Sequence, residues 1–125
     1  MIKFISLKHN SEFLKILRKK KLSCKYCTIY YDKNPNNIKN KINKYLNISF
    51  VIKKKVGNAV IRNKIKRKLK SAVQKISKQD QLIDFNYTYV IFGKNIVYKD
   101  KFEIILKNLN ETFKKIKKMD KSSWK

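Results

Sequence analysis

Apolar residues recur along this chain with two periods, and the helical period appears three times. The first helix is expected over about residues 11–21, where Ser11 is a suitable N-cap. A second is predicted from about 60 to 76, and a third from about 99 to 119. In each, the apolar side chains lie three or four positions apart and therefore share one face. These stripes are Phe13, Leu14, Ile16 and Leu17 in the first helix, Ile61, Ile65, Leu69, Ala72, Val73 and Ile76 in the second, and Phe102, Ile105, Leu106, Leu109, Phe113 and Ile116 in the third.

Three shorter stretches, at 24–31, 46–52 and 86–93, have the composition or the two-residue period of strands. The β-branched run at 46–52 is expected inside a sheet rather than at its edge. Alternation in the first stretch places Cys27, Ile29 and Tyr31 on one face and Tyr26, Thr28 and Tyr30 on the other. The order helix, strand, strand, helix, strand, helix predicts one domain in which helices pack on a sheet.

Charge narrows the range of functions. The 125 residues include 33 Lys and Arg against 8 Asp and Glu, which gives a net charge of +25. Such a surface repels itself unless a polyanion offsets it. The apolar residues fall into core stripes, which favours nucleic acid over a membrane surface as the partner. No segment has the pattern of a signal peptide or the roughly 20 apolar residues of a membrane span, so a cytoplasmic protein without a membrane partner is expected.

Cys24 and Cys27 form a C-x-x-C motif, the spacing of half a zinc site or of a redox pair. Zinc in structural sites has four ligands, whereas the chain contains no other cysteine and a single histidine, His9. Redox pairs of this spacing normally begin a helix, but these residues fall in a predicted strand, where side chains three apart point to opposite faces. We interpret the spacing as coincidence, with the zinc and redox roles as alternatives, and expect no metal bound by the protein.

The most unusual segment is KKKVGNAVIRNKIKRKLK, residues 53–70, which gathers much of the positive charge. Gly57, one of only two glycines, lies just before the second helix, and Asn58 is placed to cap that helix. Arg62 and Arg67 are two of the three arginines in a chain that otherwise uses lysine. Their planar guanidinium groups suit phosphate. The segment therefore predicts a helix that presents cations to a nucleic acid rather than only to solvent.

This segment closely resembles the signature of the bacterial ribonuclease P protein component, which reads K-K-x-G-x-A-V-x-R-N-R-x-K-R. The matching residues are Lys54, Lys55, Gly57, Ala59, Val60, Arg62, Asn63, Lys66 and Arg67. A weaker resemblance covers about residues 7–118 of a single domain, 1–125, and leaves 119–125 as a basic tail. It implies an α+β fold: a single-domain α/β sandwich with a mostly antiparallel central sheet, three helices and a left-handed strand–helix–strand crossover, an exception to the usual right-handed connection.

Proteins of this family are the small subunit of a ribonucleoprotein that removes the 5′ leader from precursor tRNA. The resemblance implies that the RNA subunit performs catalysis and holds the Mg2+ ions, with one protein per RNA. It implies that RNA is bound by Lys54, Lys55, Arg62, Asn63, Lys64, Lys66, Arg67 and Lys70. It also implies a cleft for the leader formed by Phe13, Leu17, Ile29 and Tyr31, where aromatic rings stack on unpaired bases. The alternative for Phe13 and Leu17 is a place in the core.

Four positions depart from the family pattern. Leu17 stands where a second aromatic residue is frequent, and Ser49 where glycine is common. Lys64 replaces the central arginine of the signature, and Gly93 replaces a frequent arginine. Loss of planar guanidinium groups at two of these positions predicts a protein that depends more on bulk charge.

The acidic residues show no sign of a protein active site. A nuclease that works through two metal ions needs several carboxylates that converge. The acids here are scattered along the chain, at Glu12, Asp32, Asp80, Asp84, Asp100, Glu103, Glu111 and Asp120. Three alternatives stay open: another basic RNA-binding module such as a ribosomal protein, a metal-dependent nuclease acting alone, and a membrane-surface protein. Bulk charge fits the first equally well, but an ordered signature is not expected of it. The membrane alternative needs a basic helix with a free apolar face, whereas the stripe from Ile61 to Ile76 is more simply core.

Overall fold

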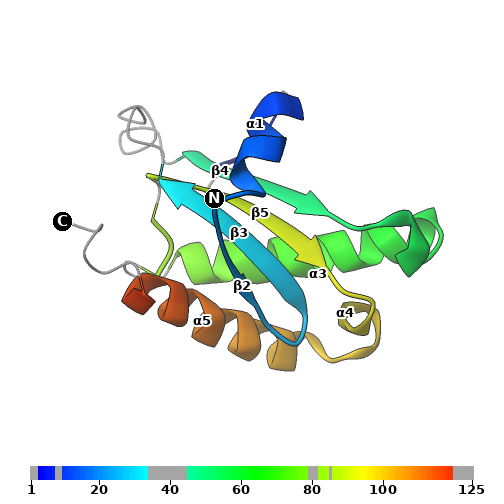
Figure 1. The fold of residues 1–125 in the computed structure, drawn as a ribbon. Coiled ribbons are helices and arrows are strands. Elements are labelled where there is room, and N and C mark those ends of the chain that lie inside the picture. The colour runs from blue at the N-terminus through cyan, green and yellow to red at the C-terminus, as the bar shows by residue number, and fades with distance from the viewer. Residues whose placement is uncertain (1–2, 8–9, 34–44, 79–81, 85, 120–125) are drawn as a thin grey trace.

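The structure, a computed structural model, describes residues 3–7, 10–33, 45–78, 82–84 and 86–119 (Figure 1). His9 and most of the predicted basic tail lie outside these residues. The strands are β1 (Lys3–Ile5), β2 (Lys20–Ser23), β3 (Cys27–Lys33), β4 (Tyr45–Val51) and β5 (Tyr87–Gly93). The helices are α1 (Asn10–Ile16), α3 (Ala59–Ser77), α4 (Ile96–Lys99) and α5 (Phe102–Met119), with a 3-10 turn, η1 (Lys54–Val56), before α3.

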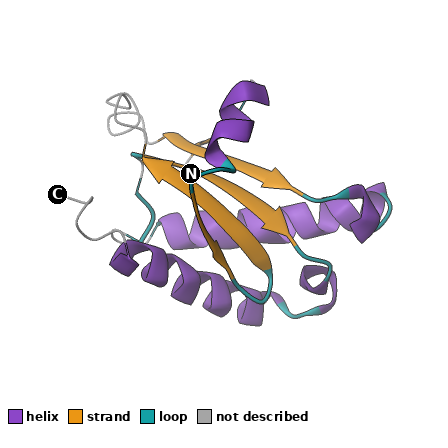
Figure 2. Cartoon of the chain, viewed as in Figure 1, coloured by secondary structure: helices purple, strands orange, loops and turns teal. Residues whose placement is uncertain are grey.

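The five strands form one sheet in the order β1-β4-β5-β3-β2. Figure 2 shows the strands in orange and the long helices behind them in purple. β5 lies at the centre of the sheet, parallel to β4 and antiparallel to β3. At the two edges of the sheet, β1 is parallel to β4 and β2 is antiparallel to β3. The sheet is therefore mixed, and the expectation of a mostly antiparallel sheet is corrected. The interior position expected for residues 46–52 is confirmed, since β4 has a neighbour on each side.

The basic helix α3 connects the parallel neighbours β4 and β5. In Figure 1 both strands point to the right, β5 lies below β4, and α3 returns behind the sheet. This path from β4 through α3 to β5 has the left-handed sense, as the family resemblance implied. It directs the start of α3 to the end of the sheet where β4 finishes.

The main core lies between the sheet and the pair α3 and α5. The stripe predicted for α3 is buried from Ile65 to Ile76, with Ile61 half-buried at its start. Phe113 of α5 packs edge-on against Tyr89 of β5, with ring centroids 5.6 Å apart. The predicted helical faces of the second and third helices are therefore confirmed.

Two edge strands were not predicted from the sequence. β1 has only three residues, and β2 was taken as the end of the first helix, which in fact stops at Ile16. β2 has the lysine-rich sequence KKLS, and its strand conformation comes from pairing with β3, where Leu22 lies opposite Ile29. Pairing with a neighbouring strand overrides local helix propensity here. The third helix is also divided, because a short turn, α4, precedes α5.

Candidate nucleic-acid interface

The turn between β4 and α3 sets the start of the basic helix. The side chain of Asn58 accepts a hydrogen bond from the Ile61 N–H at 3.0 Å, which confirms the predicted cap. A β-carbon on Gly57 would lie 3.0 Å from Cγ2 of Ile61, so glycine allows the turn to approach the helix closely. The Nε of Arg62 donates to the Gly57 carbonyl at 3.1 Å. This bond holds the guanidinium group beside the turn.

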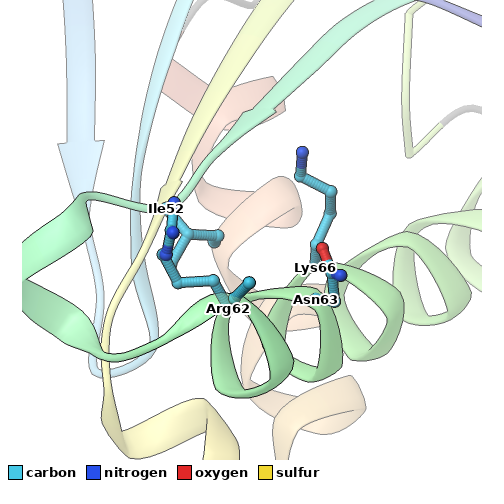
Figure 3. A pocket seen from close by; sticks show the side chains of 5 residues that line it. Ile52, Arg62, Asn63 and Lys66 are labelled. Carbon is cyan, nitrogen blue, oxygen red and sulfur yellow. The ribbon is translucent and has the colours of Figure 1, made fainter.

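A small pocket of about 100 Å3 opens next to this turn, lined by Ile52, Ala59, Arg62, Asn63 and Lys66. Figure 3 shows Arg62 and Lys66 projecting from the same side of α3, with Asn63 close to Lys66. The two cations attract an anion, and the amide of Asn63 can donate and accept at once. Three residues predicted from the signature are thus brought together around one concave site.

The remaining predicted cations do not line this pocket. Lys54 and Lys55 are exposed in η1, and Arg67 and Lys70 are exposed on α3. Lys64 lies toward α4 instead, with its Nζ 5.5 Å from the centroid of the Tyr98 ring. Lys64 is therefore on a different flank of the helix from Arg62 and Lys66.

Lys68 is a basic residue of α3 with a structural role. Its Nζ donates to three backbone carbonyl oxygens, those of Val97, Tyr98 and Asp100, at 3.0, 3.1 and 3.0 Å. These oxygens end the short helix α4 and begin the loop to α5. Lys68 thus joins α3 to α4, and its charge neutralises the dipole of the α4 carbonyl groups.

A second surface lies on the opposite face of the sheet, beside α1. The ring of Phe92 in β5 contacts Phe13 of α1 and Tyr30 of β3, with centroids 6.1 and 5.5 Å apart. The Nζ of Lys21 lies 6.0 Å from the Tyr30 ring, and the Nζ of Lys53 lies 5.7 Å from the Phe92 ring. We call these five residues the aromatic surface. It combines rings that can stack on bases with cations that can neutralise phosphates.

The leader cleft predicted from the resemblance is corrected by this arrangement. Ile29 and Tyr31 are both 0% exposed, because they face α3 and α5 in the main core. The Tyr31 ring packs near Tyr87, with centroids 6.2 Å apart. Phe13 and Leu17 are half-buried on the α1 side. The four predicted residues therefore lie on two faces of the sheet and cannot form one cleft.

Two rings of the aromatic surface, Tyr30 and Phe92, were not among the site residues predicted from the sequence. Alternation correctly separated the two faces of β3, but Ile29 and Tyr31 were taken from the face that is buried in the core. The signal was present in the composition, because the face of Cys27, Ile29 and Tyr31 is the more apolar one and therefore belongs in the core. The exposed side of the strand then carries Tyr30.

Two of the departures from the family pattern have local structural accounts. Ser49 is 7% exposed, and its hydroxyl accepts a hydrogen bond from the Leu7 N–H at 2.9 Å, which fixes the chain after β1. A β-carbon on Gly93 would lie 2.6 Å from Cδ1 of Ile52 and 2.8 Å from Cδ1 of Leu69. A larger residue at position 93 would need these side chains to move, because β5 ends directly against α3.

The cysteines also differ from the expectation. β3 begins at Cys27 rather than at Cys24, so Cys24 lies in the turn after β2 and the two side chains do not alternate. Their sulfur atoms are 3.6 Å apart. The spacing was interpreted as coincidence partly because the two side chains were expected on opposite faces of one strand. The structure removes that reason.

The part of the chain that the structure describes contains no group of three or more His, Cys, Asp or Glu residues that could hold a metal ion. Asp100 lies 3.8 Å from Lys25 and accepts a hydrogen bond from the Tyr26 hydroxyl. These contacts tie Asp100 to the turn that carries Lys25 and Tyr26. Among the described residues, no helix is both long and apolar enough to cross a bilayer.

Comparison with known sequences supports the resemblance. The profile of a family described as Ribonuclease P matches residues 1–117. The ribonuclease P protein component of Mesoplasma florum is 34% identical over 106 residues, which cover 84% of this chain and 88% of the relative. That of Carboxydothermus hydrogenoformans is 29% identical over 115 residues, or 90% of each chain.

Comparison with solved structures supports the fold. The ribonuclease P protein of Thermotoga maritima superimposes with a TM-score of 0.69 at 22% identity, covering 89% of this chain and 96% of that one. The protein of Staphylococcus aureus gives a TM-score of 0.68 at 23% identity, covering 90% and 94%. The mixed sheet and its helices are therefore an arrangement that these proteins share.

Proposed function

Because this chain belongs to the ribonuclease P protein family and is the protein subunit of the enzyme that processes the 5′ end of tRNA, we propose that its two surfaces bind two different RNA molecules. The outer side and pocket of α3 bind the catalytic RNA. The aromatic surface binds the single-stranded leader of precursor tRNA. The protein acts in the cytoplasm, one copy per RNA.

The observation that carries this proposal is the pocket beside the β4–α3 turn. The guanidinium of Arg62 is oriented by its bond to Gly57, and Lys66 and Asn63 line the same concavity. A phosphate placed there meets two cations and an amide without any rearrangement of Arg62. Charges that serve only solubility need no such orientation.

The aromatic surface supports the second half of the proposal. Leaders differ in sequence, so a site for them should recognise the planar faces of bases rather than their hydrogen-bonding edges. Phe13, Tyr30 and Phe92 offer rings from three different elements, and Lys21 and Lys53 add positive charge beside them. This combination fits a single strand of no fixed sequence.

We propose that hydrolysis takes place at Mg2+ ions held by the RNA subunit. Within the described part of the chain the acidic side chains do not fit a pair of such ions, because they form no cluster and Asp100 contacts Lys25 and Tyr26. The contribution of the protein is then to neutralise phosphate charge as the substrate docks.

Reconstitution tests this function. The full chain, a bacterial ribonuclease P RNA and a precursor tRNA are combined at low Mg2+ concentration, and leader removal is measured with and without the protein. We expect cleavage that depends on the RNA and a lower Mg2+ requirement when the protein is present. Equal activity with and without protein, or cleavage by the protein alone, would contradict the proposal.

A further inference from the structure

The turn between β2 and β3 brings together the only two cysteines of the chain. The Cys24 N–H donates to the Cys27 carbonyl at 2.8 Å, which closes the turn, and the two sulfur atoms lie 3.6 Å apart. We propose that Cys24 and Cys27 form a reversible dithiol–disulfide site, in which Cys24 attacks an oxidant and Cys27 resolves the adduct. This site is independent of the proposed function, because neither cysteine belongs to the RNA-binding surfaces.

The geometry allows the bond to form without a change of fold. A disulfide needs sulfur atoms about 2.05 Å apart, so the pair must close by roughly 1.5 Å from its present separation. Rotation about the side-chain torsions supplies such a movement, because the backbone hydrogen bond already holds the two residues across one turn. Two cysteines whose side chains diverge along a strand could not do this.

The surroundings keep the turn in this conformation. The Lys94 N–H donates to the Tyr26 carbonyl at 2.9 Å, and the Lys94 Nζ donates to the Cys24 carbonyl at 2.7 Å. The hydroxyl of Tyr26, a residue that is 0% exposed, donates to the Asp100 carboxylate. Lys94 and Asp100, which are distant in the sequence, thus hold two parts of the turn. These parts are the Cys24 carbonyl and Tyr26, the residue that lies between the cysteines along the chain.

The two thiols differ in access, which assigns their roles. Cys24 is half-buried and can be reached from solvent, whereas Cys27 is 0% exposed. The pKa of Cys24 is lowered from 9.0 to about 5, chiefly because the Cys27 thiol donates a hydrogen bond to it, against the opposing effect of burial. The pKa of Cys27 is raised by that same bond and by burial. We therefore assign Cys24 as the attacking thiolate of the proposed reaction and Cys27 as its proton-bearing partner.

The reaction that we propose uses a small disulfide such as oxidised glutathione as the oxidant. The Cys24 thiolate attacks one sulfur of the disulfide, forms a mixed disulfide and releases one glutathione thiolate. Cys27 then gives up its proton to that base, attacks Cys24 Sγ and expels the second glutathione as a thiolate. The protein loses two electrons and its one thiol proton, and the small disulfide is reduced to one thiol and one thiolate, which takes up a proton from water. Excess reduced glutathione reverses both steps.

The test uses the full chain, first reduced and then treated with oxidised glutathione, with intact mass as the readout. We expect the wild-type protein to lose the mass of two hydrogens and to retain no glutathione. Cys27→Ser should instead keep one glutathione on Cys24, since no second thiol resolves it. Cys24→Ser should react at least about tenfold more slowly, because its remaining thiol is buried.

Circular dichroism identifies any variant that fails to fold, and Cys27→Ala then replaces Cys27→Ser. The wild-type measurement does not depend on the folding of any variant. Retention of glutathione by the wild-type protein, absence of any reaction, or equal rates for the Cys24 and Cys27 variants would overturn the proposal. Activity of the reconstituted enzyme with RNA tests the proposed function separately and does not depend on any of these outcomes.

Discussion

Phe13 of α1 packs against Phe92 of β5 with their ring centroids 6.1 Å apart and their planes inclined at 56°. This contact seats the helix on the sheet and leaves both side chains half-buried rather than enclosed. Tyr30 meets the same Phe92 ring edge-on, at 69°. One ring of the central strand therefore supports two neighbours that remain accessible to a ligand.

Tyr30→Ala should lower the affinity of the reconstituted enzyme for precursor tRNA by about 1–3 kcal/mol, the value of one stacked base. Affinity for mature tRNA, which has no leader, should hardly change. Both ligands are measured by equilibrium binding with wild-type and variant enzyme. An equal loss for the two ligands would show that Tyr30 belongs to a general binding surface.

The neighbouring residue provides a matched control. Tyr31 is 0% exposed in the main core, so Tyr31→Ala should destabilise the fold by about 3–5 kcal/mol, as expected for a large buried side chain. Urea unfolding measures this loss. Opposite phenotypes at adjacent positions would confirm which face of β3 meets the RNA.

Periodicity alone identified most of the long elements. The stripe of α3 and the strands β4 and β5 are local patterns, since each contains enough apolar residues at one spacing to define its buried face. β2 could not be found in this way. Its lysines suit a helix as well as a strand, and pairing of Leu22 with Ile29 of β3 decides the matter. Information about an edge strand lies largely in its neighbour.

The α3 cations and the aromatic surface also differed in how far they could be predicted from the sequence. The cations of α3 could be predicted, because the signature, its cap and its turn are contiguous in the sequence. The aromatic surface could not, because Phe13, Tyr30 and Phe92 come from three elements and meet only after the sheet assembles. The Cys24–Cys27 contact likewise depends on where β3 begins.

Arg62→Ala combined with Arg67→Ala should weaken assembly with the RNA subunit by roughly 2–4 kcal/mol, taking about 1–2 for each charge-assisted contact. The salt dependence should also become shallower, by about 0.7–0.9 in the slope of log K against log salt for each phosphate that the protein no longer neutralises. Titration of labelled RNA at several salt concentrations gives both quantities.

The control for this double variant is Lys107→Ala combined with Lys114→Ala. Both lysines are exposed on α5, and the change removes the same total charge. We expect a clearly smaller loss of affinity, because these residues lie away from the pocket. Equal losses in the two double variants would mean that only net charge matters.

Alkylation of Cys24 should depend little on pH between about pH 6.5 and 8, because its pKa is lowered to about 5 and the reactive thiolate is already formed. An ordinary thiol, with a pKa of about 8.5, would react roughly tenfold faster for each unit of rising pH in this range. The charged groups around this turn are Lys94, which donates to the Cys24 carbonyl, and Asp100 with Lys25, which contact each other beside Tyr26.

Site-resolved mass spectrometry after brief iodoacetamide treatment measures this rate. Cys27→Ala removes the hydrogen bond that chiefly lowers the pKa of Cys24. Alkylation of Cys24 in this variant should therefore be slower than in the wild-type protein at low pH, and its rate should rise with pH. A steep pH dependence in the wild-type protein would show that Cys24 is an ordinary thiol.

Lys66 and Lys68 lie on the same helix but should give opposite phenotypes on replacement by methionine. Lys68 donates three hydrogen bonds to carbonyl oxygens at the end of α4 and just beyond it. Its loss should reduce the free energy of unfolding by about 1.5–3 kcal/mol, the value of hydrogen bonds to a charged group. Lys66 lines the pocket beside Arg62, and its replacement should leave stability nearly unchanged while weakening RNA binding.

Both variants remove one positive charge and keep an unbranched apolar stem, so each serves as the control for the other. Urea unfolding and RNA titration are measured on both proteins under the same conditions. Lys68→Met should retain most of its RNA affinity wherever it is folded, because the Lys68 Nζ is directed to backbone oxygens of the protein. If Lys68→Met lost as much RNA affinity as Lys66→Met, or if Lys66→Met were the less stable protein, the division of α3 into a binding side and a structural side would be wrong.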